Sequence, residues 1–280
     1  MCVGLDPDPA VAGKAFPDAL GETPAERAGD AVARWCRQVL ESAGPACVAV
    51  KPQLACFERL GAPGWKALAS AVESARAAGL LVIADGKRGD VPVSAAAYAQ
   101  ALFGSTPSPF GEVAGLGADA ATLNGILGRD SLAPLVQEAA GAGAGIFVLV
   151  RTSNPGAADF LDQPSSEAPL HERLAGLVDE LGGELRGTTG LSGVGAVVGA
   201  TEPGHIARLR ELMPDAPFLL PGVGAQGGSA QDLGPAFGSH PASAIVTASR
   251  SIAGTPNPAE AAEALRREVW DVACRALDTG

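Results

Sequence analysis

Three charged residues follow a short apolar run in the first third of the chain. Residues 80–84 have the composition of a buried strand, and Asp85, Lys87 and Asp90 come directly after it in the pattern D-x-K-x-x-D. Because side chains alternate along a strand, we expect Asp85 and Lys87 on the same side. A buried carboxylate and ammonium are costly unless they pair or act on a ligand. The pattern therefore predicts either a structural ion-pair network or a lysine that carboxylates keep charged and ready to donate a proton.

Other polar residues follow other apolar runs in the same way. They are Asp6, Lys51, Ser153, the glycine-rich segment 221–228 with Gly224 and Gln226, and the pair Ser249 and Arg250. Each has a plain reading: Asp6 as a turn former before proline, Lys51 as a solvated lysine, and Ser153 as part of a turn. Considered together, they suggest one site assembled from the ends of several strands.

The elements that would position these residues alternate along the chain. Eight short apolar runs are separated by helical segments, at residues 2–5, 47–50, 80–84, 120–123, 145–150, 194–198, 218–220 and 244–247. This order over about 250 residues is typical of a single-domain (β/α)8 barrel, here spanning residues 1–280. A doubly wound open sheet is the alternative, but it would place its glycine-rich loop after the first strand, where this chain has Asp6 and prolines. In a barrel the polar residues above meet at the carboxyl ends of the strands.

Two helix starts carry clear capping signals. Each start has a capping residue, then a proline at the first helical position and a glutamate at the third. The residues are Thr23, Pro24 and Glu26 at one start, and Asn257, Pro258 and Glu260 at the other. Further helices are expected near residues 64–78, 95–103, 130–140 and 203–212, and a loop and a helix within 157–182. Residues 106–111 are expected to form a loop. The segments 104–117 and 158–168 carry no motif.

The composition limits the possible partners. A net charge of −11 argues against a nucleic-acid partner, although a few local cations can still bind a small anion. The five cysteines form no C-x-x-C pair and are expected to be reduced thiols. None of the three histidines has metal-ligand spacing; we expect His171 and His205 on helix surfaces and His240 in a loop, and no metal site. No apolar run is long enough to span a membrane, so a soluble cytoplasmic protein is expected, and its natural start could lie further upstream.

An anion-binding site is expected after the seventh and eighth strands. Segment 221–228 contains four glycines whose backbone N–H groups could approach a phosphate. Arg250, at the end of the eighth strand, could add a bidentate contact. Barrels often bind phosphate with these two loops.

These residues resemble a known family. The chain is similar to orotidine 5′-monophosphate decarboxylases in four places. These are Asp6, the run Lys51-Pro52-Gln53, the D-x-K-x-x-D pattern and the segment P-G-V-G-A-Q-G-G at 221–228. The longer run K-P-Q-x-x-x-F-E-R at 51–59 resembles the bacterial type 2 branch. The resemblance covers residues 2 to about 252.

The resemblance implies loss of CO2 from orotidine 5′-monophosphate without a cofactor, giving uridine 5′-monophosphate. Lys87 would stabilise and protonate the C6 carbanion, Asp85 would lie beside the departing carboxylate, and Lys51 and Asp90 would complete a Lys-Asp-Lys-Asp array. Asp90 would reach the partner's site in a homodimer. Asp6 would bind the ribose, Ser153 the pyrimidine, Gln226 both base and phosphate, and Gly224 and Arg250 the phosphate. Ser249 stands where many relatives have glycine, and no role for Arg88 follows.

Two other functions stay open from the sequence. A sugar-phosphate decarboxylase or hexulose-phosphate synthase of the same superfamily would use the D-x-K-x-x-D pattern to hold Mg²⁺, but Lys51 and Gln226 speak against it. A catalytically silent, nucleotide-binding barrel would lack one of the four charged positions, and all four are present.

Overall fold

The barrel strands follow one another in a closed order. The computed structural model describes residues 1–164, 168–224, 226–238 and 240–278. Its strand order is β1-β10-β9-β8-β7-β6-β3-β2, closed on itself, with β4 and β5 in a separate two-stranded sheet. The bounds of the barrel strands are β1 (Cys2–Leu5), β2 (Ala49–Pro52), β3 (Leu81–Arg88), β6 (Ala120–Leu123), β7 (Gly145–Arg151), β8 (Val194–Val198), β9 (Phe218–Leu220) and β10 (Ala244–Ala248). The (β/α)8 prediction is confirmed, and the doubly wound sheet is excluded because an open sheet has two edge strands.

The chain forms two compact units. The first comprises Met1–Gly86 with Ser249–Arg266, and the second comprises Lys87–Ala248 with Arg267–Gly280. The division falls inside β3, between Gly86 and Lys87. The single-domain expectation stays a prediction.

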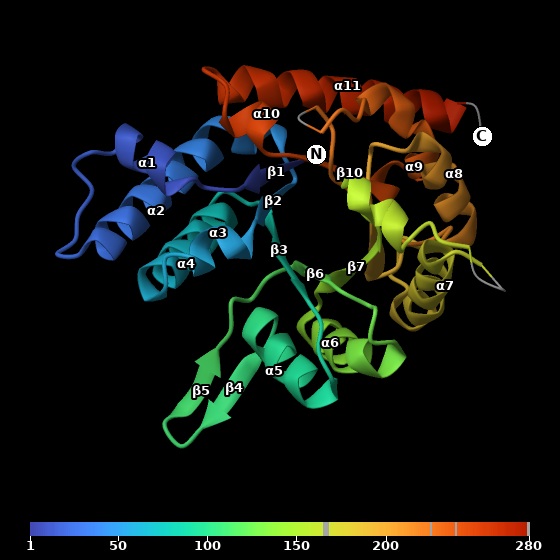
Figure 1. Cartoon of the computed structure of the whole chain (residues 1–280), viewed down its shortest axis with the longest axis horizontal. Helices are drawn as coiled ribbons and strands as arrows, with labels where there is room; N and C mark the ends of the chain where they lie inside the picture. Colours follow the sequence, from blue (N-terminus) through green and yellow to red (C-terminus); the bar gives the residue numbers. More distant parts are fainter. Residues whose placement is uncertain (165–167, 225, 239, 279–280) are drawn as a thin grey trace. The chain divides into compact units, whose positions relative to one another are not determined.

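In the first unit, β1 and β2 are covered by paired helices. The parallel register places Gly4 opposite Lys51 and Leu5 opposite Pro52. Helices α2 and α4 lie side by side (Figure 1). The capping signals at both helix starts are confirmed: Thr23 and Glu26 form a reciprocal capping box, and Asn257 and Glu260 exchange hydrogen bonds at the start of α11. Its helices are α1 (Pro9–Ala15), α2 (Pro24–Ala43), η1 (Gly44–Ala46), α3 (Leu54–Glu58), α4 (Ala62–Ala77), α10 (Arg250–Ala253) and the first part of α11 (Pro258–Asp278).

In the second unit, helices cover the parallel strands β6 to β10. Large apolar side chains such as Leu135, Ile146, Leu209 and Phe218 are fully buried between them. Its helical segments are α5 (Pro92–Leu102), α6 (Arg129–Ala142), η2 (Pro155–Asp159), α7 (Leu170–Gly182), η3 (Gly183–Leu185), α8 (Pro203–Leu212), η4 (Ala230–Leu233), α9 (Gly234–Phe237) and η5 (Pro241–Ser243). Part of the motif-free segment 158–168, residues 165–167, lies outside the described residues.

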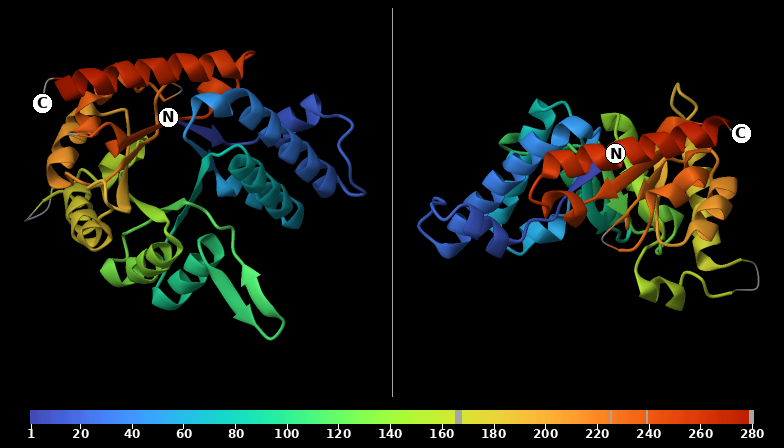
Figure 2. Two further views of the ribbon diagram at one scale, coloured as in Figure 1. Left: turned by 180° about the vertical axis from the view of Figure 1, so that it is seen from behind. Right: turned by 90° about the horizontal axis from the view of Figure 1, so that it is seen from above.

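The segment expected as a loop at 106–111 is a β-hairpin. Strands β4 (Ser105–Ser108) and β5 (Gly111–Ala114) pair antiparallel beside α5 (Figure 2). Neither strand has a buried face, so the alternation of apolar and polar residues that marks a half-buried strand is absent. The expectation of a loop was wrong for this reason.

Two barrel strands reach at least two residues further along the chain than expected. Strand β2 runs over 49–52 rather than 47–50, because Val48 is exposed and Cys47 ends η1. Strand β3 continues through the charged residues as far as Arg88 rather than ending at 84. A charged side chain is compatible with a buried strand where a partner neutralises it, and Lys51 and Asp85 meet this condition.

No helix among the described residues combines the length and apolar character that crossing a membrane requires.

Candidate active site

Lys51 and Asp85 form a buried ion pair in the first unit. Their side chains, from adjacent strands β2 and β3, bring Nζ to 2.5 Å from Oδ2, and the two residues are 6% and 4% exposed. Burial alone lowers the pKa of the Lys51 ammonium, but the negative charges of Asp85 and Asp6 outweigh burial and raise the pKa above its ordinary value. Lys51 is therefore charged at neutral pH, and Asp6 is near enough to act on it.

Gln53 belongs to the same cluster. Its Nε2 donates to Oδ2 of Asp85 at 3.2 Å, so this carboxylate oxygen accepts from both an ammonium and an amide. The sequence marked Gln53 only as part of the Lys-Pro-Gln run. Its contact with Asp85 depends on the pairing of β2 with β3, which one strand's composition does not specify.

Ser249 lies directly over Gly4 of β1. A Cβ atom on Gly4 would lie 1.8 Å from Oγ of Ser249, which means that only glycine leaves room for the serine. Arg250 follows as the exposed first residue of α10. The first unit thus brings Ser249 against β1, with Arg250 directly after it.

Lys87 begins the second unit with an unusual backbone. Its φ is +48°, the only positive value among the non-glycine residues that the structure describes. Its backbone N–H donates to Oγ1 of the buried Thr122 at 3.0 Å, which helps hold this conformation. Strain of this kind collects at functional sites. The simple alternation assumed from the sequence is interrupted at Lys87, and its side chain is exposed.

Arg88 and Asp90 anchor the turn that follows. The Arg88 guanidinium lies 5.6 Å from the ring centroid of Tyr98 on α5, and its carbonyl accepts from the N–H of Asn124 at 2.8 Å. The sequence had given no role to Arg88; in the structure it holds the end of β3 to α5. Asp90 is half-buried, and its Oδ1 accepts from the N–H of Val91.

Ser153 and Gln226 meet although 73 positions separate them. Oγ of Ser153 donates to Oε1 of Gln226 at 2.6 Å. Ser153 follows β7 and Gln226 follows β9, so the two loops converge at the carboxyl ends of their strands. The family resemblance implied that both residues contact the pyrimidine, and the structure brings their side chains together.

The glycine-rich segment 221–228 is closed by its own backbone. The N–H groups of Gly224, Gly227 and Gly228 donate to the carbonyls of Gly228, Gly224 and Gly222 respectively. An anion would therefore need other N–H groups of this segment. Ala225 lies outside the described residues, and a phosphate contact at Gly224 stays a prediction.

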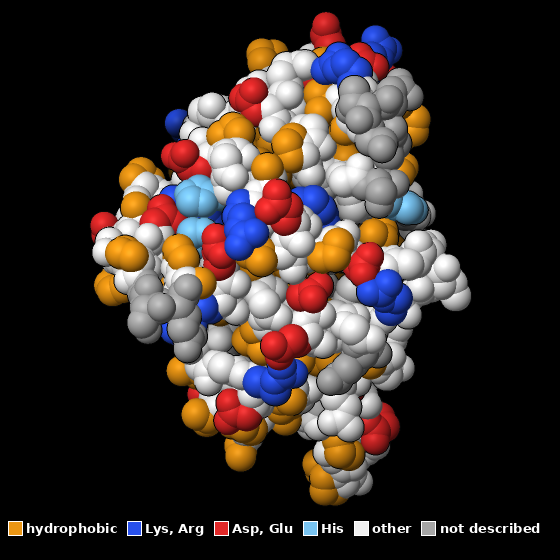
Figure 3. Space-filling view, turned by 90° about the vertical axis from the view of Figure 1, so that its right-hand side faces the viewer, with side chains coloured by type: hydrophobic (Ala, Val, Ile, Leu, Met, Phe, Trp, Pro, Cys, Tyr) orange, Lys and Arg blue, Asp and Glu red, His pale blue; other side chains and the backbone are white. Residues whose placement is uncertain are grey.

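A cluster of two histidines and an aspartate lies after β7. His171 is buried at the start of α7, contrary to the expectation of a surface position, while His205 is partly exposed on α8 and His240 caps η5. The rings of His171 and His205 meet edge to face with their centroids 4.8 Å apart, and Figure 3 shows two adjoining histidines among charged side chains on one face.

This cluster has donor atoms suited to a metal ion, but they are engaged. One donor atom each of Asp162, His171 and His205 lies within 4.8 Å of the others. Both oxygens of Asp162 accept from the Arg151 guanidinium, and Nδ1 of His171 lies 2.7 Å from the carbonyl of Leu161. A cation would be repelled by the adjacent guanidinium. The arrangement therefore fits a hydrogen-bonded ion-pair cluster better than a metal centre.

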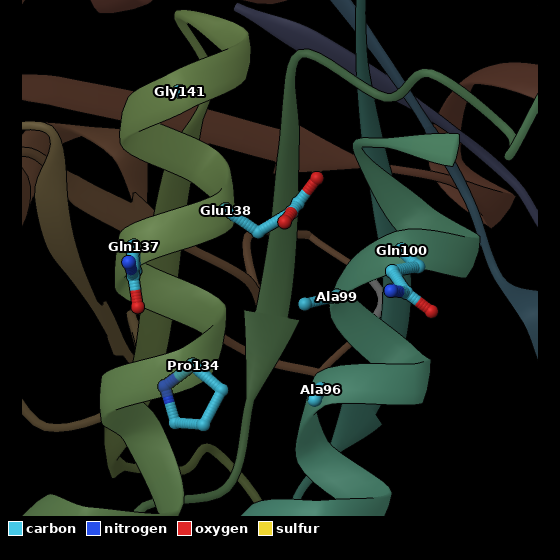
Figure 4. Close-up of a pocket in the computed structure, with 7 residues that line it drawn as sticks. All are labelled: Ala96, Ala99, Gln100, Pro134, Gln137, Glu138 and Gly141. Carbon is cyan, nitrogen blue, oxygen red and sulfur yellow. The ribbon is translucent and has the colours of Figure 1, made fainter. Parts of the chain in front are cut away.

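A surface pocket between α5 and α6 is unrelated to these residues. Its volume is about 350 Å³, and none of the candidate residues lines it. Figure 4 shows the Glu138 side chain on α6 pointing toward α5, with short alanine side chains opposite.

Comparison with known proteins covers nearly the whole chain. Residues 1–265 match the family described as Orotidine 5′-phosphate decarboxylase / HUMPS. The chain belongs to this family.

Curated relatives in the family carry the name orotidine 5′-phosphate decarboxylase. The protein of Rhodopirellula baltica is 40% identical over 98% of this chain and 90% of its own length. That of Deinococcus radiodurans is 44% identical over 90% of this chain and 83% of its own length. Among solved structures, Leishmania donovani OMP decarboxylase is 30% identical, covers 98% of this chain and 93% of its own, and has a TM-score of 0.77.

Proposed function

We propose that the chain converts orotidine 5′-monophosphate to uridine 5′-monophosphate and CO2 without a cofactor, as the last step of de novo uridine 5′-monophosphate synthesis. The names of the curated relatives support this assignment over nearly the full chain. The observation that carries it is the buried ion pair of Lys51 and Asp85. Asp85 stands two residues before Lys87 in the sequence.

The proposed chemistry depends on fixed charges. Loss of CO2 leaves an electron pair on C6 of the pyrimidine that the ring delocalises poorly. The Lys87 ammonium stabilises this carbanion and then gives C6 its proton. Asp85, which Lys51 holds in one orientation, lies beside the departing carboxylate, and like charges there disfavour the bound substrate. Such charges act strongly where water is excluded.

The remaining residues bind the substrate. Asp6 binds the ribose hydroxyl groups, and the Ser153–Gln226 pair binds the pyrimidine. Arg250, with the backbone near Ser249 and Gly224, takes the phosphate. Binding energy at the phosphate would help to assemble the site around the reacting carbon.

The Mg²⁺-dependent alternative of the same family fits less well. There the strand-3 aspartate would coordinate a cation, but Oδ2 of Asp85 already accepts from Lys51 and Gln53. A metal ion would have to displace a buried ammonium. Decarboxylation that survives EDTA supports our proposal, whereas activity that Mg²⁺ restores after EDTA treatment supports the alternative.

A homodimer follows from the proposed role of Asp90 in the neighbouring site. Asp90 is followed by two exposed apolar residues, Val91 and the 85% exposed Val93, which a second copy would cover. Mixing inactive Asp90→Asn with inactive Lys87→Ala should restore part of the activity, because one site of a mixed dimer is then intact. We also place the protein in the cytoplasm, in keeping with five free thiols.

The direct test follows the ultraviolet absorbance of orotidine 5′-monophosphate with the wild type, Lys87→Ala and Lys66→Ala. Lys66 is an exposed lysine on α4 and serves as the matched control. We expect activity in the wild type and in Lys66→Ala and almost none in Lys87→Ala. An inert wild type, or a fully active Lys87→Ala, would overturn the assignment. An inert wild type that still binds uridine 5′-monophosphate would indicate the silent nucleotide-binding barrel.

A further inference from the structure

Arg151 is a buried arginine two residues before Ser153. It is the last residue of β7 and 6% exposed. Its Nε and Nη2 donate to Oδ1 and Oδ2 of Asp162 at 2.7 and 2.8 Å, and its Nη1 donates to the carbonyl of Thr152. One guanidinium therefore joins the Asp162 carboxylate to the backbone just before Ser153.

The same turn is held on its other side by the segment after β8. The N–H of Gly199 donates to the carbonyl of Arg151 at 2.7 Å, and Oγ1 of Thr201 lies 3.5 Å from the carbonyl of Ser153. A Cβ on Gly199 would lie 2.7 Å from Cα of Ser153. The backbone from Arg151 to Ser153 is thus held by Gly199 and Thr201 on one side, and by the Arg151 guanidinium at the Thr152 carbonyl.

Asp162 is itself well held. The Arg151 guanidinium keeps the pKa of its carboxyl below the ordinary value, so it is ionised at neutral pH. Its Oδ1 lies 3.4 Å from Nδ1 of His171 and 3.8 Å from Nε2 of His205. The carboxylate therefore offers the guanidinium a fixed partner, anchored near the starts of α7 and α8.

We propose that Arg151, fixed by Asp162, is a positioning residue that sets Ser153 for contact with the pyrimidine. This inference rests on the proposed function. Its proposed action is indirect: Arg151 holds the Thr152 carbonyl, and through it the direction of the Ser153 hydroxyl toward Gln226. The bidentate fork requires arginine, because a lysine ammonium cannot bind both oxygens of Asp162 and the Thr152 carbonyl in one plane.

The first test asks whether the variants weaken binding of the base or binding of the rest of the nucleotide. Binding of uridine 5′-monophosphate and of ribose 5-phosphate is measured by calorimetry for the wild type, Arg151→Lys and Asp162→Asn. We expect both variants to bind uridine 5′-monophosphate about 10-fold more weakly, the cost of one misplaced hydrogen bond, and ribose 5-phosphate as well as the wild type does. Equal weakening of both ligands would indicate a merely structural role and overturn the proposal.

Arg208→Lys is the matched control. Arg208 also makes a bidentate pair, with Glu172, but on the exposed surface of the same unit. It should leave the binding of both ligands unchanged. Asp162→Asn keeps the size of the side chain, so the test stands even if Arg151→Lys folds poorly.

A double-mutant cycle with Ser153→Ala decides whether Arg151 acts through Ser153. If it does, Arg151→Lys has almost no further effect on uridine 5′-monophosphate binding once the hydroxyl is absent. Additive losses would contradict the proposal. Because the readout is binding, a chain that binds the nucleotide but does not decarboxylate its substrate would refute the proposed function and leave this inference standing.

Discussion

Lys51 and Asp85 lie on neighbouring strands with their charged atoms 2.5 Å apart, and both side chains are almost completely buried. Because two charges share one dry environment, each is tolerated only while the other is present. The pair therefore links the stability of the first unit to the site.

Removal of Lys51 should damage both folding and activity. Lys51→Met leaves the Asp85 carboxylate buried without its ammonium, and we expect a loss of about 3–5 kcal/mol in the free energy of unfolding. Lys51→Met/Asp85→Leu removes both charges and should recover most of that stability without recovering decarboxylation. Urea unfolding and the absorbance assay measure the two effects, and Lys66→Met is the control. A stable, active Lys51→Met would contradict the role of the pair.

The same pair predicts a loss of stability at alkaline pH. The pKa of Lys51 is higher in the folded chain, so its contribution is complete below the unfolded pKa of about 10.4. That contribution disappears as the pH rises through the higher folded pKa. The difference in unfolding free energy between the wild type and Lys51→Met should stay constant to about pH 10 and shrink above it. A difference that instead shrinks between neutral pH and pH 9 would contradict a raised pKa of Lys51 in the folded chain.

Gly4→Ala should disturb Ser249 and hence phosphate binding. The new Cβ would occupy the place of Oγ of Ser249, so we expect KM to rise about 10-fold or more, as small displacements in a site can cause. Ser249→Gly removes both clashing atoms and leaves Cα at 3.4 Å, an ordinary contact. Gly4→Ala/Ser249→Gly should therefore bind better than Gly4→Ala alone. In the control Gly13→Ala, where nothing lies within 4 Å, KM should not change.

The positive φ of Lys87 predicts an unusual order of stability. Glycine adopts this conformation without strain, whereas other residues pay about 1–2 kcal/mol. Glycine also loses more entropy on folding, which offsets part of this gain. We therefore expect Lys87→Gly to be more stable than Lys87→Ala, by about 1 kcal/mol in the free energy of unfolding. On helix α4 the order should reverse, with Lys66→Gly less stable than Lys66→Ala. Thermal denaturation of the four variants compares the two positions, and the same order at both would rule out backbone strain at Lys87.

The barrel was predictable because its short, apolar strands alternate with helices, and because capping residues such as Thr23 and Glu26 act locally. The pairing of Lys51 with Asp85 was also within reach, since both follow predicted strands. Gln53, Thr122 and the Arg151–Asp162 pair were missed because their partners are set by strand register and loop path. The burial of His171 likewise depends on the loop that precedes α7.

The hairpin at 105–114 is closed at its base, where the N–H of Gly115 donates to the carbonyl of Gly104 at 2.9 Å, and Phe110 at its tip is 99% exposed. Its two ends therefore already meet, whatever lies between them. The segment can lengthen, shorten or accept a foreign sequence without altering the path of α5 or β6, which makes it a natural place to graft a reporter or an affinity tag onto this enzyme scaffold.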